Sequence, residues 1–107
     1  IDNNFKPLND AQKDEFGKMA DEVITFISRC MLEIKRNDYT AFDQLVEKAV
    51  SISNALTQLK KNELKRIQGQ SGSTKVSMVY LNMIQETQNV VSFTSNLIKV
   101  SRKFQME

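Results

Sequence analysis

Apolar residues recur every three or four positions in three long stretches of the chain, and this spacing predicts three α-helices. The first predicted helix, about residues 10–36, has its stripe at Phe16, Ala20, Val23, Ile27, Cys30 and Ile34, flanked by Met19, Ile24, Phe26 and Met31. The second, about 39–69, has Phe42, Leu45, Ala49, Ile52, Leu56 and Leu59, flanked by Val46, Val50, Leu64 and Ile67. The third, about 73–105, has Val76, Tyr80, Met83, Thr87, Val90, Thr94 and Leu97, flanked by Val79, Ile84, Val91 and Ile98. Each apolar face is wide enough to face a helix-bundle core.

Polar and glycine-containing breaks separate the three predicted helices. Asn9, with Gln12 three positions later, can form a capping box at the first helix. Asp38 or Thr40 can cap the second helix, and the Gly69–Ser73 turn leads into the third. Because both connections are short, neighbouring helices must run antiparallel. The sequence therefore predicts an all-α fold, an up-down-up three-helix bundle over residues 9–107, preceded by a linker or arm over residues 1–8 that holds the only proline.

Composition narrows the function classes without choosing one. The 107 residues suffice for one domain, with 40% hydrophobic and 26% charged residues, as in an ordinary globular protein. One cysteine and no histidine exclude a disulfide framework and a multi-cysteine zinc site, and remove the commonest general base. No apolar run approaches the roughly 20 residues of a membrane span, and no cationic targeting segment opens the chain. A net charge of +2 is too mild for a typical nucleic-acid-binding domain, so nucleic-acid binding is disfavoured.

Candidate chemical groups are few. Cys30 lies on the predicted core stripe without a histidine partner, which favours a buried structural thiol. Asp43 and Glu47 stand four apart on one helix face and could hold one hydrated cation, although a solvated surface pair is favoured. The turn from Gly69 to Lys75 lacks the Walker spacing, so a hinge followed by a helix cap is favoured over a phosphate site. We therefore predict no enzymatic activity, no catalytic residue and no cofactor.

Two surface features suggest binding instead. The apolar surface of the third predicted helix continues sideways, beyond what two neighbouring helices need to cover, through Val79, Phe93, Val100 and Phe104. Such a strip on a small bundle predicts a partner surface, either for a second copy or for another helical protein. A basic cluster frames the second turn and comprises Lys60, Lys61, Lys65, Arg66 and Lys75. It either complements the helix dipole or forms a binding patch.

The third predicted helix resembles the last helix of a PhoU-type domain. The resemblance rests on Tyr80–Glu86 and Asn96–Ile98, and Leu64–Ile67 with the following turn resembles the form found at the C-terminus of bacterial sodium/phosphate symporters. PhoU proteins carry two such three-helix repeats, with acidic motifs that bind metal clusters. The matching positions here are Gln88 and Ser92, which are uncharged, so we expect no tight iron or zinc cluster. Asn96 matches a family asparagine.

The resemblance implies a regulatory or structural domain of a sodium-dependent phosphate cotransporter, on the cytoplasmic face of the inner membrane. Such a domain would act by docking on the membrane core of its transporter or by self-association, and would meet the membrane only through its parent chain. A chain start without methionine, with a polar arm, is expected of such a piece. If the chain is tethered through this arm, the basic cluster would face the anionic leaflet. The alternative is a free-standing helical protein–protein interaction or signalling module.

Overall fold

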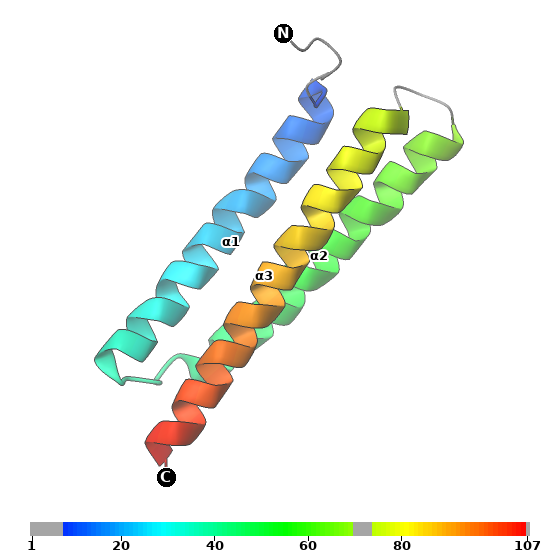
Figure 1. Ribbon diagram of the computed structural model, residues 1–107. Coiled ribbons are helices and arrows are strands. Elements are labelled where there is room, and N and C mark those ends of the chain that lie inside the picture. Colours follow the sequence, from blue (N-terminus) through cyan, green and yellow to red (C-terminus); the bar gives the residue numbers. More distant parts are fainter. Residues whose placement is uncertain (1–7, 70–73, 107) are drawn as a thin grey trace, which may run out of the picture.

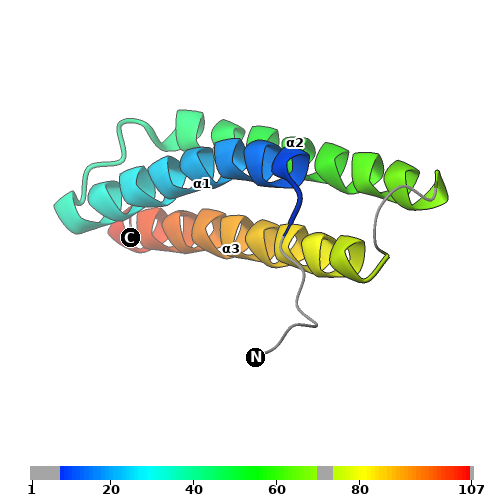
Figure 2. The same ribbon diagram turned by 90° about the horizontal axis from the view of Figure 1, so that it is seen from above.

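Three α-helices in an up-down-up arrangement make up the computed structural model, which describes residues 8–69 and 74–106. The helices are α1 (Asp10–Arg36), α2 (Phe42–Gln68) and α3 (Thr74–Met106). They run alongside one another over most of their length (Figure 1, Figure 2), in a body 53 × 30 × 19 Å across. Every pair of helices is in contact. The predicted all-α three-helix bundle is therefore confirmed.

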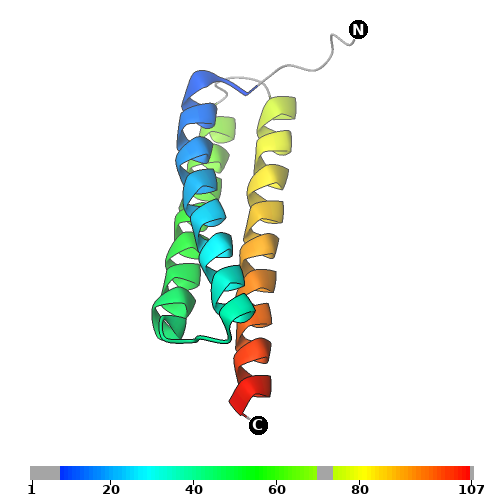
Figure 3. The same ribbon diagram turned by 90° about the vertical axis from the view of Figure 1, so that its left-hand side faces the viewer.

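The bundle has two ends, which we call the Asn9 end and the Asn37 end. At the Asn9 end α1 begins, α2 finishes and α3 begins; at the Asn37 end α1 finishes and α2 begins. At the Asn37 end α3 runs past both other helices (Figure 3), since its 33 residues exceed the 27 of each neighbour. The arm predicted over residues 1–8 lies outside the described residues except for Leu8, which packs against the core.

The caps explain where the first helix begins and ends. The predicted capping box is present: the Asn9 side chain accepts a hydrogen bond from the Gln12 amide at 2.8 Å, and the Asn9 amide donates to the Gln12 side chain at 2.9 Å. At the other end Asn37 adopts a left-handed conformation, φ 53°, which asparagine tolerates better than most residues. Its amide donates to the carbonyls of Glu33 and Ile34, which closes the helix.

The predicted start of the second helix is wrong by three residues. Asp38 or Thr40 was expected to cap it, but the Asp38 carboxylate accepts hydrogen bonds from the amide and hydroxyl of Thr40, and the two residues close a turn before the helix. The N-cap is Ala41, which has no capping side chain. Glu33 of α1 supplies the missing acceptor, because its Oε2 accepts a hydrogen bond from the Ala41 amide at 3.1 Å. The cap of α2 is thus supplied by a side chain of the preceding helix, and not by the residues next to its own first turn.

The core runs along the middle of the bundle and draws on all three helices. Its buried apolar residues are Met19, Val23, Phe26, Cys30, Leu45, Ala49, Ile52, Leu56, Tyr80, Ile84, Val91 and Ile98. In α1 and α2 every predicted stripe position is buried or half-buried, but the flanking Ile24, Met31, Val50 and Leu64 are exposed. In α3 the predicted stripe is confirmed only in part: Tyr80 and Thr94 are buried, but Val90 is 45% exposed, while the predicted flanks Ile84, Val91 and Ile98 are buried. The buried side of α3 is thus rotated from the predicted one.

Candidate functional site

A second apolar seam runs along α3, outside the core. Its nine positions alternate three and four residues apart: Val76, Val79, Met83, Glu86, Val90, Phe93, Leu97, Val100 and Phe104. This is the heptad spacing of a helix that packs against another helix, and Glu86 is its one polar residue. We call these nine positions the outer seam. The buried residues of α3, from Ser77 and Tyr80 to Ile98, form a separate inner seam.

The outer seam is exposed over most of its length. Val79 is 44% exposed, Val90 45%, Phe93 68%, Val100 53% and Phe104 75%. The remaining apolar members, Val76, Met83 and Leu97, are half-buried. All four residues that the sequence predicted as a partner surface therefore do lie on the surface of α3. Val90 was not predicted as part of this surface, because it had been assigned to the core stripe. The alternating three- and four-residue spacing of the seam is the signal that could have identified it.

The outer seam faces away from α2. Gln88 marks the side of α3 that faces α2, because its Nε2 donates to the Ser53 carbonyl at 3.0 Å and to Thr57 Oγ1 at 2.9 Å. At about 100° per residue, Val79 and Val90 lie roughly 160–180° around the helix from Gln88. α2 therefore cannot cover that side, and the exposure of Val79, Val90 and Phe93 shows that α1 leaves it largely open as well. The outer seam is thus left for solvent or for a partner.

Exposed apolar residues of α1 add to the same side of the molecule. Phe16 faces α3, since its ring meets the Tyr80 ring edge-on at 6.1 Å between centroids. Glu22 faces α2, where its carboxylate pairs with the Lys48 ammonium at 3.0 Å. By the same helical geometry, Ile24 lies on the opposite side of α1 from Glu22, next to the side that carries Phe16. Its side chain is 61% exposed. Together with Met31, seven residues further on, it borders the seam from α1.

The structure divides the predicted basic cluster. Lys61, Lys65 and Lys75 are exposed, whereas Lys60 is half-buried and donates to the Gln85 side chain of α3 at 2.5 Å. Arg66 is also half-buried, and two carboxylates from two helices hold its guanidinium. The surface part of the cluster is therefore smaller than the sequence indicated.

Arg66 belongs to a buried polar network at the Asn9 end. Its guanidinium donates two parallel hydrogen bonds to the Glu15 carboxylate, each at 3.0 Å, and a third to Glu63 at 2.5 Å. Hydrogen bonding to Glu15, and then to Glu63, raises the pKa of Arg66 still further above its usual range, against an opposing effect of burial. The guanidinium thus stays charged and joins α1 to α2.

Glu63 is the centre of this network and is 1% exposed. Besides Arg66, it accepts hydrogen bonds from Gln12 Nε2 at 3.0 Å and from Ser77 Oγ at 2.5 Å. Tyr80 closes the network by donating its hydroxyl to Glu15 at 2.8 Å. Burial, and then the Glu15 contact, raises the pKa of the Tyr80 hydroxyl. Sequence reasoning missed this network, although a glutamate at an inward-facing position of α2 was visible.

The predicted metal candidates lie on the surface of α2. Asp43 and Glu47 are both exposed on α2. In residues 8–69 and 74–106 no group of three or more histidine, cysteine, aspartate or glutamate side chains could hold a metal ion. The two positions at which the sequence resemblance predicted a counterpart of the PhoU metal motif differ in the structure: Gln88 donates hydrogen bonds to α2, whereas Ser92 and the nearby Asn96 are exposed.

Cys30 is fully buried, as the sequence predicted. Burial, together with the nearby Glu33 charge, raises the pKa of its thiol from 9.0 to about 11. A thiol that holds its proton so strongly is a poor nucleophile. The structure places it in the core, away from solvent.

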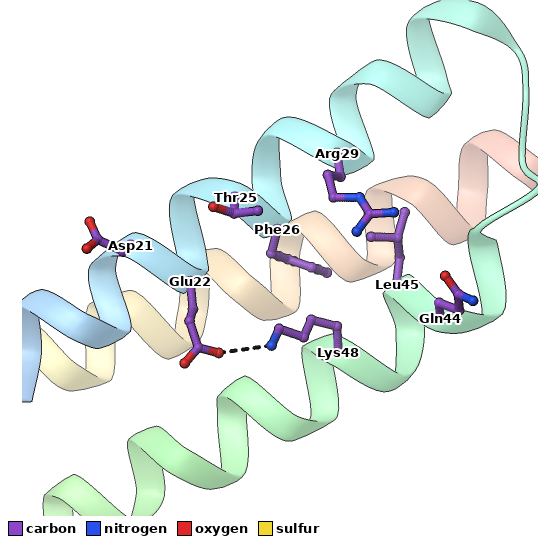
Figure 4. Close-up of a pocket in the computed structure, with 8 residues that line it drawn as sticks. All are labelled: Asp21, Glu22, Thr25, Phe26, Arg29, Gln44, Leu45 and Lys48. Atoms are coloured by element: carbon purple, nitrogen blue, oxygen red, sulfur yellow. Dashed lines mark ion pairs between the residues drawn. The ribbon is translucent and has the colours of Figure 1, made fainter.

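A shallow groove of about 420 Å³ lies between α1 and α2 (Figure 4). Phe26 and Leu45 form its floor, and the Glu22–Lys48 ion pair crosses it. Its rim carries two acidic and two basic side chains, which leave no excess charge to attract an ion. The groove is best described as the open surface depression between two packed helices.

No described helix has an apolar stretch long enough to cross a bilayer. Comparison with known proteins finds no matching family model, no matching curated protein and no matching solved structure. The candidate site therefore rests on geometry, and the geometry singles out the outer seam of α3.

Proposed function

We propose that this bundle is a non-catalytic docking domain that binds another helical surface through the outer seam of α3. One observation carries the proposal: five large apolar side chains, Val79, Val90, Phe93, Val100 and Phe104, are 44–75% exposed along one side of one helix. Single exposed apolar residues are normal on any protein. A row of them at heptad spacing is the pattern of a helix that packs against a partner helix.

The size of this surface supports docking. From Val79 to Phe104 the seam extends for about 38 Å at 1.5 Å per residue. A fully exposed aromatic residue presents about 150–250 Å², so Phe93 and Phe104 alone leave on the order of 250 Å² of apolar surface in solvent. With the three valines the patch reaches the upper range found on monomeric proteins, where such patches usually mark interaction sites.

The proposed setting is the cytoplasmic face of a bacterial inner membrane, in a sodium-dependent phosphate transporter. This part rests on the sequence resemblance to PhoU-type domains. Tyr80, Ile84 and Ile98, which carry much of that resemblance, are fully buried. In this proposal they would supply the core packing of a PhoU-type three-helix repeat. The domain would then regulate or support transport by docking on the transport core.

Reading the gene upstream of Ile1 tests the setting. Paired hydrophobic spans preceding the domain would support the transporter, since the domain would then follow a membrane core. A gene that encodes little beyond these residues would replace the transporter with the alternative, a free-standing interaction module. The docking surface itself would be unaffected by that result.

Peptide binding tests the docking surface. The probe is a synthetic amphipathic helix with leucine at its heptad positions and lysine elsewhere, titrated into isotope-labelled domain and followed by amide chemical shifts. We expect shifts along Val79–Phe104, lost in Phe93→Asp and kept in Val50→Asp, because Val50 is 57% exposed but lies on α2. Shifts confined to α2, or no binding at all, would refute the docking function.

A further inference from the structure

The outer seam of α3 is complementary to itself when a second copy runs in the opposite direction. If Val90 of one copy faces Phe93 of the other, the same register places Val79 opposite Phe104 and Met83 opposite Val100, because the two numbers in each pair have the same sum. We propose that the partner is a second copy of this chain, paired through α3 in antiparallel orientation. This proposal rests on the proposed docking function.

Side-chain size supports this register. A valine meets a phenylalanine at the centre, Val90 with Phe93, and again at each end, Val79 with Phe104. Alternation of small and large side chains across a helix pair fills space evenly and allows close packing. A parallel pairing would instead set Phe93 against Phe93 and Val90 against Val90, which gives crowded layers next to loose ones.

Charge also favours the antiparallel direction. Glu86 is the only charged member of the outer seam, and a parallel pair would bring the two Glu86 carboxylates face to face. Like charges juxtaposed in an interface oppose association. In the antiparallel register Glu86 faces Leu97 of the partner copy, and the two carboxylates lie apart. The exposed residues along the free edge of the seam, each seven positions apart, are Lys75, Asn82, Asn89, Asn96 and Lys103, so the middle of the interface is uncharged and the lysines lie at its ends.

The area suffices for a weak but specific dimer. Taking about 150–200 Å² for each fully exposed residue, the five exposed apolar members present roughly 500 Å² per copy, or about 1,000 Å² for the pair. A specific interface needs about 1,000 Å² or more. Ile24 and Met31, exposed beside the seam on α1, supply further apolar area. A two-fold pair uses the same surface on both copies, so a single seam completes the assembly.

Disulfide trapping between two single variants tests direction and register together. Val79→Cys and Phe104→Cys are prepared separately, one with an affinity tag, mixed, and oxidised with diamide. We expect a covalent dimer in the mixture and little in either sample alone, because only the antiparallel register joins position 79 to position 104. Cys30 is buried with a raised pKa, so it can stay in place. Val50→Cys mixed with Phe104→Cys is the matched control and should give no more than background.

Covalent dimers in the unmixed samples would show a parallel pair and overturn the proposal. A size-exchange series then tests the packing by light scattering, where the chain of 12.3 kDa should give twice that mass at high concentration. Val90→Phe and Phe93→Val should each weaken association at least tenfold, and the double exchange should restore it. Scattering from a monomer at every concentration, with peptide still bound at the seam, would overturn self-pairing and leave the docking function intact. A protein that neither self-associates nor binds the peptide would refute both the self-pairing and the docking function.

Discussion

The two ends of the bundle are held together by different chemistry. At the Asn9 end a buried network of charged and polar side chains, centred on Glu63 and Arg66, joins all three helices. At the Asn37 end single contacts do the joining: Glu33 caps α2, Arg102 lies over the Phe42 ring at 4.3 Å, and Gln105 donates to the Asn37 carbonyl at 3.1 Å. A buried network fails as a unit when one member is removed, whereas separate contacts fail one at a time. The Asn9 end should therefore be the more sensitive to substitution.

The largest expected effect separates the two ends directly. Glu63→Ala leaves Gln12, Ser77 and Arg66 without their common acceptor, so we expect a loss of about 3 kcal/mol in the free energy of unfolding. Glu33→Ala removes one cap and should cost about 1 kcal/mol. Urea unfolding of both variants measures the difference. Equal losses in the free energy of unfolding would mean that the buried network stabilises the fold no more than a single cap does.

Alkaline titration examines both ends in one experiment. The pKa of Cys30 rises from 9.0 to about 11 on folding, and that of Tyr80 is also raised. The native state therefore keeps protons that the unfolded chain releases, so this stability is complete below pH 9 and is lost as pH rises further. Each group contributes a slope of up to about 1.4 kcal/mol per pH unit.

Two variants assign the alkaline loss to its sources. Cys30→Ala should remove the part that begins near pH 9, and Tyr80→Phe the part that begins near pH 10, where an unfolded tyrosine ionises. Unfolding midpoints measured from pH 7 to 11 give both slopes. Identical curves for wild type and both variants would contradict the assignment.

A smaller effect is expected from the cation–π contact at the Asn37 end. Arg102→Ala should cost about 0.5–1 kcal/mol, because the guanidinium lies over Phe42 near the surface, where such contacts are weak. Lys99→Ala, an exposed neighbour on α3, is the control and should change little. A loss as large as that of Glu63→Ala would show that the two ends are equally interdependent.

The smallest effect concerns the membrane. If the chain is tethered through its N-terminus, the Asn9 end lies nearest the anionic leaflet, where the exposed Lys61, Lys65 and Lys75 would add attraction. Their replacement by Gln should lower binding of a lipid-tethered form to anionic vesicles by a few fold at low salt, and by little at physiological salt. Lys35→Gln with Lys103→Gln, near the Asn37 end, is the control. An equal drop in both sets would refute the orientation.

Local pattern determined much of this protein. The helical spacing and the breaks between helices were enough to predict three helices, with α1 bounded at Asp10 and Arg36 as expected. The Asn9–Gln12 capping box was readable because its partners are three residues apart, and the burial of Cys30 was readable because the residue lies on a regular stripe. Such features depend on neighbours along the chain.

Tertiary structure decided the rest. Both seams of α3 have the same period, so the sequence cannot say which one faces the core; the positions of α1 and α2 bury Ile84, Val91 and Ile98 and leave Val90 and Phe93 exposed. Arg66 was predicted as part of a surface patch because Glu15, its bidentate partner, lies 51 residues away. Glu33 was not predicted to cap α2, because its contact with the Ala41 amide crosses the turn between two helices. Contacts between distant residues depend on how the helices are placed, and periodicity within one helix carries no information about that placement.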